Sequence, residues 1–136
     1  MKNGFSDQVK AVVEEVLAGE IQISYGNPAP YNNFVAEGDS VTAVSASGRV
    51  MTGSEAVKQA SVTVSEGNIG ETNRFMEFIS GDMTDNMMYA VFKTGVTISK
   101  TDGSLSDLCW VVTFVFRRQA DGRWALVHRQ NTRSKP

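Results

Sequence analysis

The chain contains one cysteine and one histidine, and this scarcity excludes several kinds of site. Cys109 cannot form a disulfide within the chain, and its place in the apolar run 108–112 predicts a small buried hydrophobic residue rather than a catalytic thiol. One cysteine and one histidine do not make a zinc site, and the sequence has no phosphate loop, dinucleotide fingerprint or nucleophile elbow. We therefore expect no metal and no cofactor.

Long apolar runs and blocks of like charge are also missing. No run reaches the roughly 18 apolar residues of a membrane span, and the N-terminal residues lack the pattern of a signal peptide. The formal net charge of −2 argues against nucleic acid or an anionic membrane as the main partner. The basic residues near the C-terminus are interpreted as a solvated face or rim: Arg117, Arg118, Arg123, Arg129, Arg133 and Lys135. These observations predict a cytoplasmic protein with no nucleic-acid or membrane partner.

The 136 residues, 41% of them hydrophobic, fit a single domain spanning 1–136 with a core of its own. A first helix, capped by Ser6 or Asp7, carries one apolar stripe: Val9, Val12, Val13, Val16 and Leu17. Glu20 continues this stripe and either lies inside the fold or reaches out at its edge. The segment 26–30 ends the helix, and we expect a short second helix at 29–36 and a third from Glu55.

Alternating apolar residues and turn dipeptides predict strands at 41–44, 75–80, 87–99, 108–118 and 124–132. Tight turns between the last four strands predict an antiparallel sheet, and a run of helices before a run of strands is typical of helices gathered on one side. Such a sheet must curve to wrap its helices, and a pocket then forms between the layers. The predicted fold class is α+β, with three helices packed on the concave side of the sheet.

Three stretches, in this order, resemble one family. They are 26–31 (GNPAPY) with 39–42 (DSVT), then 53–57 (GSEAV), then 112–118 (VTFVFRR) with 121–129 (DGRWALVHR). They are similar to the SnoaL-like branch of the nuclear transport factor 2-like superfamily, to which ketosteroid isomerases, polyketide cyclases and the association domain of calmodulin-dependent kinases also belong. The resemblance covers nearly the whole chain. It implies a cone-shaped fold with a deep pocket and a tendency to dimerise.

The chain departs from the ketosteroid isomerase pattern at two positions. Those enzymes use an aspartate base together with an oxyanion hole that includes a tyrosine. The matching part of the first strand reads Val44-Ser45, and the matching position of the first helix falls near Gly19. The resemblance therefore does not imply a true steroid isomerase.

Two residues are candidates for proton transfer. His128 is the only side chain that titrates near neutral pH when unperturbed, and strict alternation places it on one face of the last strand with Trp124, Leu126 and Gln130. Arg129 and Asn131 would lie on the other face. Glu20, if it lies inside the cone, is the second candidate and could pair with His128. The structural alternatives are a hydrogen-bonded strand histidine and a solvated glutamate.

The remaining candidates are ligand-binding residues. Tyr31 and Gln130 would orient a polar group of a ligand, and the aromatic side chains Trp110, Phe78, Tyr89 and Phe114 would supply apolar wall or core. The leading hypothesis is a domain that binds a small, largely apolar organic molecule and, as an enzyme, would catalyse cofactor-independent isomerisation, cyclisation or dehydration. The alternative is a non-catalytic binding or dimerisation module.

The strand from Leu108 to Phe116 bears on the assembly of the chain. It is apolar on both faces, so a second subunit is the expected cover for the face that the helices leave free. The sequence therefore predicts a homodimer through the sheet.

Overall fold

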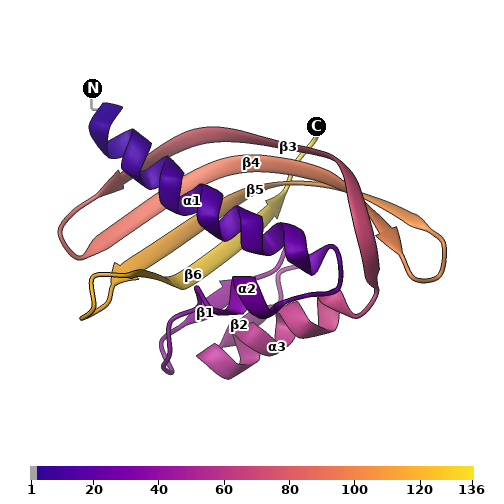
Figure 1. Ribbon diagram of the computed structural model, residues 1–136, viewed down its shortest axis with the longest axis horizontal. Coiled ribbons are helices and arrows are strands. Elements are labelled where there is room, and N and C mark those ends of the chain that lie inside the picture. Colours follow the sequence, from indigo (N-terminus) through magenta and orange to yellow (C-terminus); the bar gives the residue numbers. More distant parts are fainter. Residues whose placement is uncertain (1–2) are drawn as a thin grey trace.

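The computed structural model describes residues 3–136, and a long helix, α1 (Asn3–Ile23), crosses the concave side of a curved sheet (Figure 1). The predicted apolar stripe of α1 faces the sheet, because Val9, Val13 and Val16 are fully buried. The helix begins at Asn3, so Ser6 and Asp7 lie inside it and the predicted cap position is wrong. The stripe, rather than the cap, is what orients this helix.

Six strands form one sheet in the order β2-β1-β6-β5-β4-β3. The strands are β1 (Thr42–Val44), β2 (Val50–Thr52), β3 (Asn68–Met83), β4 (Met87–Lys100), β5 (Leu105–Arg118) and β6 (Trp124–Arg133). The four long strands are joined in sequence as antiparallel neighbours, as the tight turns predicted. One pairing differs from the expected pattern, because β1 runs parallel to β6. The first and last strands of the chain therefore lie side by side (Figure 1).

Two shorter helices close one end of the concave side (Figure 1). The second, α2 (Ala29–Asn32), stops before the predicted residue 36 because the following backbone pairs with β6 instead. Leu126 donates its N–H to the Phe34 carbonyl and accepts a hydrogen bond from the Ala36 N–H. The third helix, α3 (Ser54–Ser65), begins one residue before the predicted start.

Gly19 allows α1 and α2 to approach each other closely. A Cβ atom at this position would lie 2.9 Å from the backbone nitrogen of Tyr31, a distance that real Cβ contacts do not reach. The glycine therefore brings Tyr31, which is buried, against the body of the molecule. This packing gives a structural reason for glycine at the position where the isomerases carry tyrosine.

The core lies between α1 and the concave face of β4, β5 and β6. Phe92, Phe114 and Phe116 are fully buried there, and their rings meet edge to face with centroids 5.1 and 5.6 Å apart. On β5, the residues that alternate with Phe114 and Phe116, such as Val111 and Val115, therefore point to the outer, convex face. Cys109 belongs to this outer row opposite Gly95 and is only half-buried, so the prediction of a buried cysteine is wrong.

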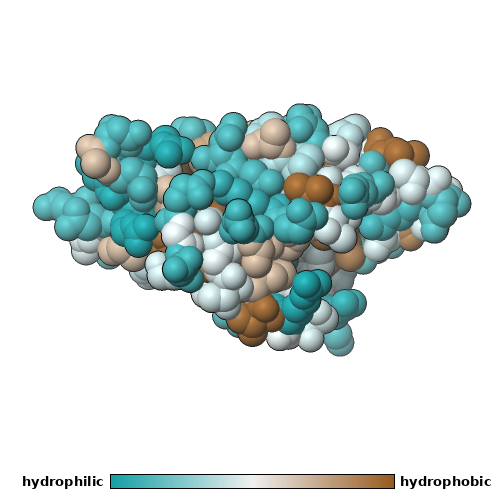
Figure 2. Space-filling model, turned by 90° about the horizontal axis from the view of Figure 1, so that it is seen from below, coloured by the Kyte–Doolittle hydropathy of each residue, from teal (hydrophilic) through white to brown (hydrophobic). Residues whose placement is uncertain are grey.

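Within residues 3–136, no helix combines the length and hydropathy needed to cross a bilayer. The face shown in Figure 2 is mainly hydrophilic, and its hydrophobic side chains form small separate patches.

Candidate functional site

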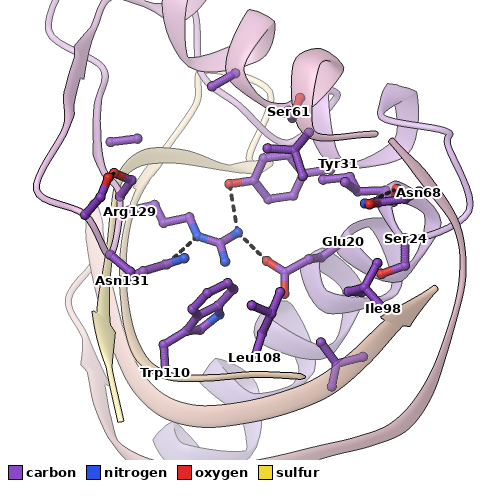
Figure 3. Close-up of a pocket in the computed structure, with 18 of the residues that line it drawn as sticks. Glu20, Ser24, Tyr31, Ser61, Asn68, Ile98, Leu108, Trp110, Arg129 and Asn131 are labelled. Atoms are coloured by element: carbon purple, nitrogen blue, oxygen red, sulfur yellow. Dashed lines mark hydrogen bonds and ion pairs between the residues drawn. The ribbon is translucent and has the colours of Figure 1, made fainter. Parts of the chain in front are cut away.

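A cavity of about 380 Å³ lies between the helices and the concave face of the sheet. Its wall is mostly apolar, and its size falls within the range of small-molecule sites in proteins. Apolar side chains come from α3, β2, β4 and β5: Met51, Val57, Ala60, Val64, Val96, Ile98, Leu108 and Trp110. Polar and charged groups also line it: Glu20, Ser24, Tyr31, Asn68, Arg74, Arg129 and Asn131. Figure 3 shows Arg129 between Asn131, Tyr31 and Glu20.

Arg129 is the centre of the polar group. Its Nε donates to Asn131 Oδ1 at 2.9 Å, and its Nη1 donates to the Tyr31 hydroxyl at 3.3 Å and forms an ion pair with Glu20 Oε1. The guanidinium also lies over the Phe114 ring, with Cζ 5.4 Å from the ring centroid. The side chain is only 14% exposed, so the interpretation of Arg129 as part of a solvated face is wrong.

A second arginine, Arg74, holds the other oxygen of Glu20. Its Nη1 lies 3.4 Å from Glu20 Oε2 and 3.3 Å from Thr94 Oγ1. Its Nε and Nη2 donate to the two carboxylate oxygens of Glu71 at 3.0 and 2.6 Å, a bidentate pair. Glu20, which is 9% exposed, is thus held between two guanidinium groups.

Two β-bulges turn these arginines into the cavity. On β3 the register shifts between Thr72 and Phe75, with Asn73 at a φ of 60°, so Arg74 points inward where strict alternation would place it outward. On β6 the register shifts at Val127, which lies between the paired residues Leu126 and His128. The inward row therefore passes from Leu126 to Arg129 and Asn131.

The charges of the cluster support one another electrostatically. Burial acts to lower the pKa of Arg129, but the Glu20 carboxylate and the Tyr31 hydroxyl together outweigh it, so that the pKa is raised. Burial acts to raise the pKa of Glu71, but the hydrogen bonds and charge of Arg74 together with a hydrogen bond from Ser24 outweigh it, so that this pKa is lowered. Burial raises the pKa of the Tyr31 phenol against the opposing charge of Arg129. Tyr31 is therefore a neutral hydroxyl at physiological pH.

Three of the residues predicted for the site line the cavity. Glu20 enters from α1, Tyr31 from α2 and Trp110 from β5. Glu20 lies inside the fold rather than at the edge of its stripe, and the buried arginines explain how the fold tolerates its charge. The catalytic and binding roles of these residues stay predictions.

The structure places His128 and Gln130 outside the cavity. They pair with Val115 and Thr113 of the outer row, and His128 Nδ1 lies 2.8 Å from Thr42 Oγ1. His128 therefore cannot meet Glu20, and the expected pair does not form. The physical reason is the bulge at Val127, which exchanges the two faces of β6 relative to strict alternation.

The other aromatic candidates also lie elsewhere. Tyr89 is 42% exposed on the outer face, where it pairs with Val115. Phe78 is half-buried against the core, with Lys10 Nζ 5.4 Å from its ring centroid. Phe114 is a core residue beneath Arg129 and is not in the cavity wall.

Arg74, Arg129 and Asn131 are the site residues that the sequence did not indicate. One signal could have pointed to them: a glutamate in an apolar helical stripe needs a buried cation if it lies inside the fold. Which cation supplies this charge depends on the two bulges, and these are seen only in the structure.

Comparison with known proteins identifies the fold. No protein-family model and no curated protein matches the sequence. Among solved structures, a ketosteroid isomerase-like protein from Erwinia carotovora atroseptica matches with a TM-score of 0.75 at 12% identity, over 94% of this chain and 95% of that one. A nuclear transport factor 2-like superfamily protein from Salmonella enterica serovar Typhimurium matches with a TM-score of 0.74 at 14% identity, over 96% and 94%. The association domain of calcium/calmodulin-dependent protein kinase II from C. elegans matches with a TM-score of 0.67 at 15% identity, over 96% and 99%.

These similarities confirm the predicted fold. The chain has the α+β architecture of nuclear transport factor 2-like proteins, with a curved, unclosed six-stranded sheet. Sequence identities of 12–15% support a shared fold and nothing more specific. Membership of the SnoaL-like branch of the superfamily therefore stays a prediction.

Proposed function

We propose that the chain binds a small, largely apolar organic molecule in its cavity. One observation carries the proposal: a mostly apolar cavity of about 380 Å³ in whose wall Asn131, Tyr31 and Glu20 converge on Arg129. The polar groups have partners within the protein, so they are rigid before a ligand arrives. Such a site can fix the orientation of a ligand while the apolar wall supplies most of the affinity.

The same geometry favours binding over proton transfer. Glu20 is the one carboxylate in the described cavity wall, and each of its oxygens faces a guanidinium group. Both oxygens are thus engaged by charged side chains of the protein, whereas a general base needs an oxygen within hydrogen-bond reach of the substrate proton. Together with the position of His128 on the outer face, this arrangement weighs against the isomerase, cyclase and dehydratase alternatives.

Filling the cavity from α3 is expected to abolish binding. Ala60 lines the cavity, so Ala60→Phe occupies space that a ligand would use, whereas Ala56→Phe places the same ring on the exposed side of α3. We expect the neutral fluorescent probe N-phenyl-1-naphthylamine to bind the wild type and the Ala56→Phe variant saturably. The Ala60→Phe variant should bind at least about tenfold more weakly, since it loses most of the apolar contact.

The test has a clear negative result. Fluorescence titration that shows no saturable binding to the wild type, or equal binding to both variants, would contradict the proposal. Thermal unfolding of each variant, measured alongside, verifies that the protein used in the titration is folded.

A second candidate function is self-association through the outer face of the sheet. Apolar side chains form adjacent rows on that face: Tyr89, Val91, Val111 and Val115. One of the similar structures is described as an association domain, which supports assembly as a property that this fold can have. The occupant that we propose is a second copy of the chain, packed sheet to sheet.

Light scattering at micromolar concentration should give twice the chain mass for the wild type. Val111→Glu places a charge in the middle of the proposed interface and should give a monomer. Val50→Glu, on the exposed edge strand β2, should remain dimeric. A monomeric wild type would rule out the homodimer. A cytoplasmic location stays a prediction from the sequence.

A further inference from the structure

The polar part of the cavity offers hydrogen-bond donors, and this limits the kind of head group that it can bind. We propose that the ligand carries a single carboxylate, bound by Arg129 and Asn131, with its apolar body against the wall formed by α3, β2 and β4. This inference rests on the proposed binding function and specifies the ligand class.

The hydrogen bonds of Arg129 leave one of its nitrogens available. Nε is used by Asn131, and Nη1 by Tyr31 and Glu20. Within the described part of the chain, Nη2 has no hydrogen-bond partner. It is also not fully buried. In Figure 3 this nitrogen points toward the space beside Trp110. An Arg129 nitrogen with two N–H donors therefore faces the cavity.

Asn131 supplies a second donor. Its Oδ1 accepts the hydrogen bond from Arg129 Nε at 2.9 Å, and Nε can only donate. This contact fixes the orientation of the amide, because the reverse orientation would set two donors against each other. The Asn131 amide nitrogen is therefore the free end of that side chain, next to the guanidinium. Two adjacent donor groups match the two oxygens of a carboxylate.

The charge of the cavity points to the same class of ligand. Three cationic side chains line it, Arg74, Arg129 and Lys100, against one carboxylate, Glu20. Glu71, bound to Arg74, adds a second negative charge. One positive charge is left in excess, and a ligand with one negative charge balances it. An ion in a partly apolar cavity is stable only when its charge is compensated in this way.

The inference is tested with a matched pair of ligands, 3-phenylpropanoate and its neutral amide, 3-phenylpropanamide, by isothermal titration calorimetry. The two differ at the head group and share the apolar body. The wild type should bind the carboxylate at least about tenfold more tightly than the amide, as expected for a charge-assisted hydrogen bond. Glu20→Gln should increase the affinity for the carboxylate, because it removes the competing anion beside Arg129.

Asn131→Asp is the discriminating variant, since it has the same shape as the wild type and keeps the acceptor for Arg129 Nε. It replaces the amide donor with a negative charge, so the carboxylate should lose at least about tenfold in affinity while the amide binds as before. Asn86→Asp, in the exposed turn between β3 and β4, makes the same charge change away from the cavity and should leave both affinities unchanged.

The outcomes separate this inference from the proposed function. Equal affinity for acid and amide, or no binding of either by protein that binds N-phenyl-1-naphthylamine, would overturn the carboxylate and leave the apolar binding function standing. Failure of that neutral probe as well would defeat the proposed function itself.

Discussion

Replacing Arg129 with methionine is expected to lower the free energy of unfolding by about 3–5 kcal/mol, because it leaves a buried carboxylate without its main partner. Glu20 is 9% exposed, and its Oε1 has no hydrogen bond within residues 3–136, so the ion pair with Arg129 is its main compensation. Arg74 contacts only the other oxygen, at 3.4 Å. Urea denaturation at pH 7 measures the loss.

Removing both charges should restore most of that stability. In the Glu20→Leu/Arg129→Met double variant, no unpaired charge remains between the helix and the sheet, while Arg74 keeps its bidentate contact with Glu71. Arg123→Met is the matched control, since the Arg123 side chain is 57% exposed, and it should change stability little. If the double variant is as unstable as the single one, the loss comes from packing rather than from the isolated charge.

Replacing Phe114 with alanine is expected to lower the free energy of unfolding by a similar amount, about 3–5 kcal/mol. Its ring is fully buried, meets Phe92 and Phe116 edge to face, and lies beneath the Arg129 guanidinium. The alanine variant loses these contacts and leaves a void in a closely packed core. Chemical denaturation of purified protein measures the effect.

A second aromatic truncation provides the control. Phe75 lies on the outer face, where its ring covers Gly95 and is 39% exposed, so Phe75→Ala should cost much less than Phe114→Ala. Equal losses for the two variants would show that Phe114 does not hold the core together.

The side chains that stabilise the fold at Glu20 also line the cavity proposed to bind a ligand. The cluster formed by Glu20, Arg74, Arg129, Tyr31 and Asn131 positions charged groups in a mostly apolar wall, and each member has a partner within the protein. Such preorganisation removes the cost of ordering these side chains when a ligand binds. Replacing Arg129, which is both the main partner of Glu20 and the proposed donor to the ligand, should therefore weaken carboxylate binding and stability together.

Much of the architecture follows from local sequence patterns. The apolar stripe of α1 repeats with helical spacing, and the tight turns of the C-terminal half bound long alternating strands. These patterns predicted three helices and the four-stranded antiparallel order of β3 to β6. They missed the first half of β3, because the bulge at Asn73 interrupts its alternation.

The candidate site was predictable only in part, and the reason is geometrical. The sequence by itself determined that Glu20 continues the apolar stripe of α1, because helical periodicity is a local property. That its side chain lies inside the fold is seen only in the structure. Only the tertiary structure decided which strand residues meet it, because a single extra residue in a strand exchanges its two faces. The bulge at Val127 turned Arg129 and Asn131 inward and His128 outward, and it shows only in the pairing of β6 with β5, not in the periodicity of β6 itself.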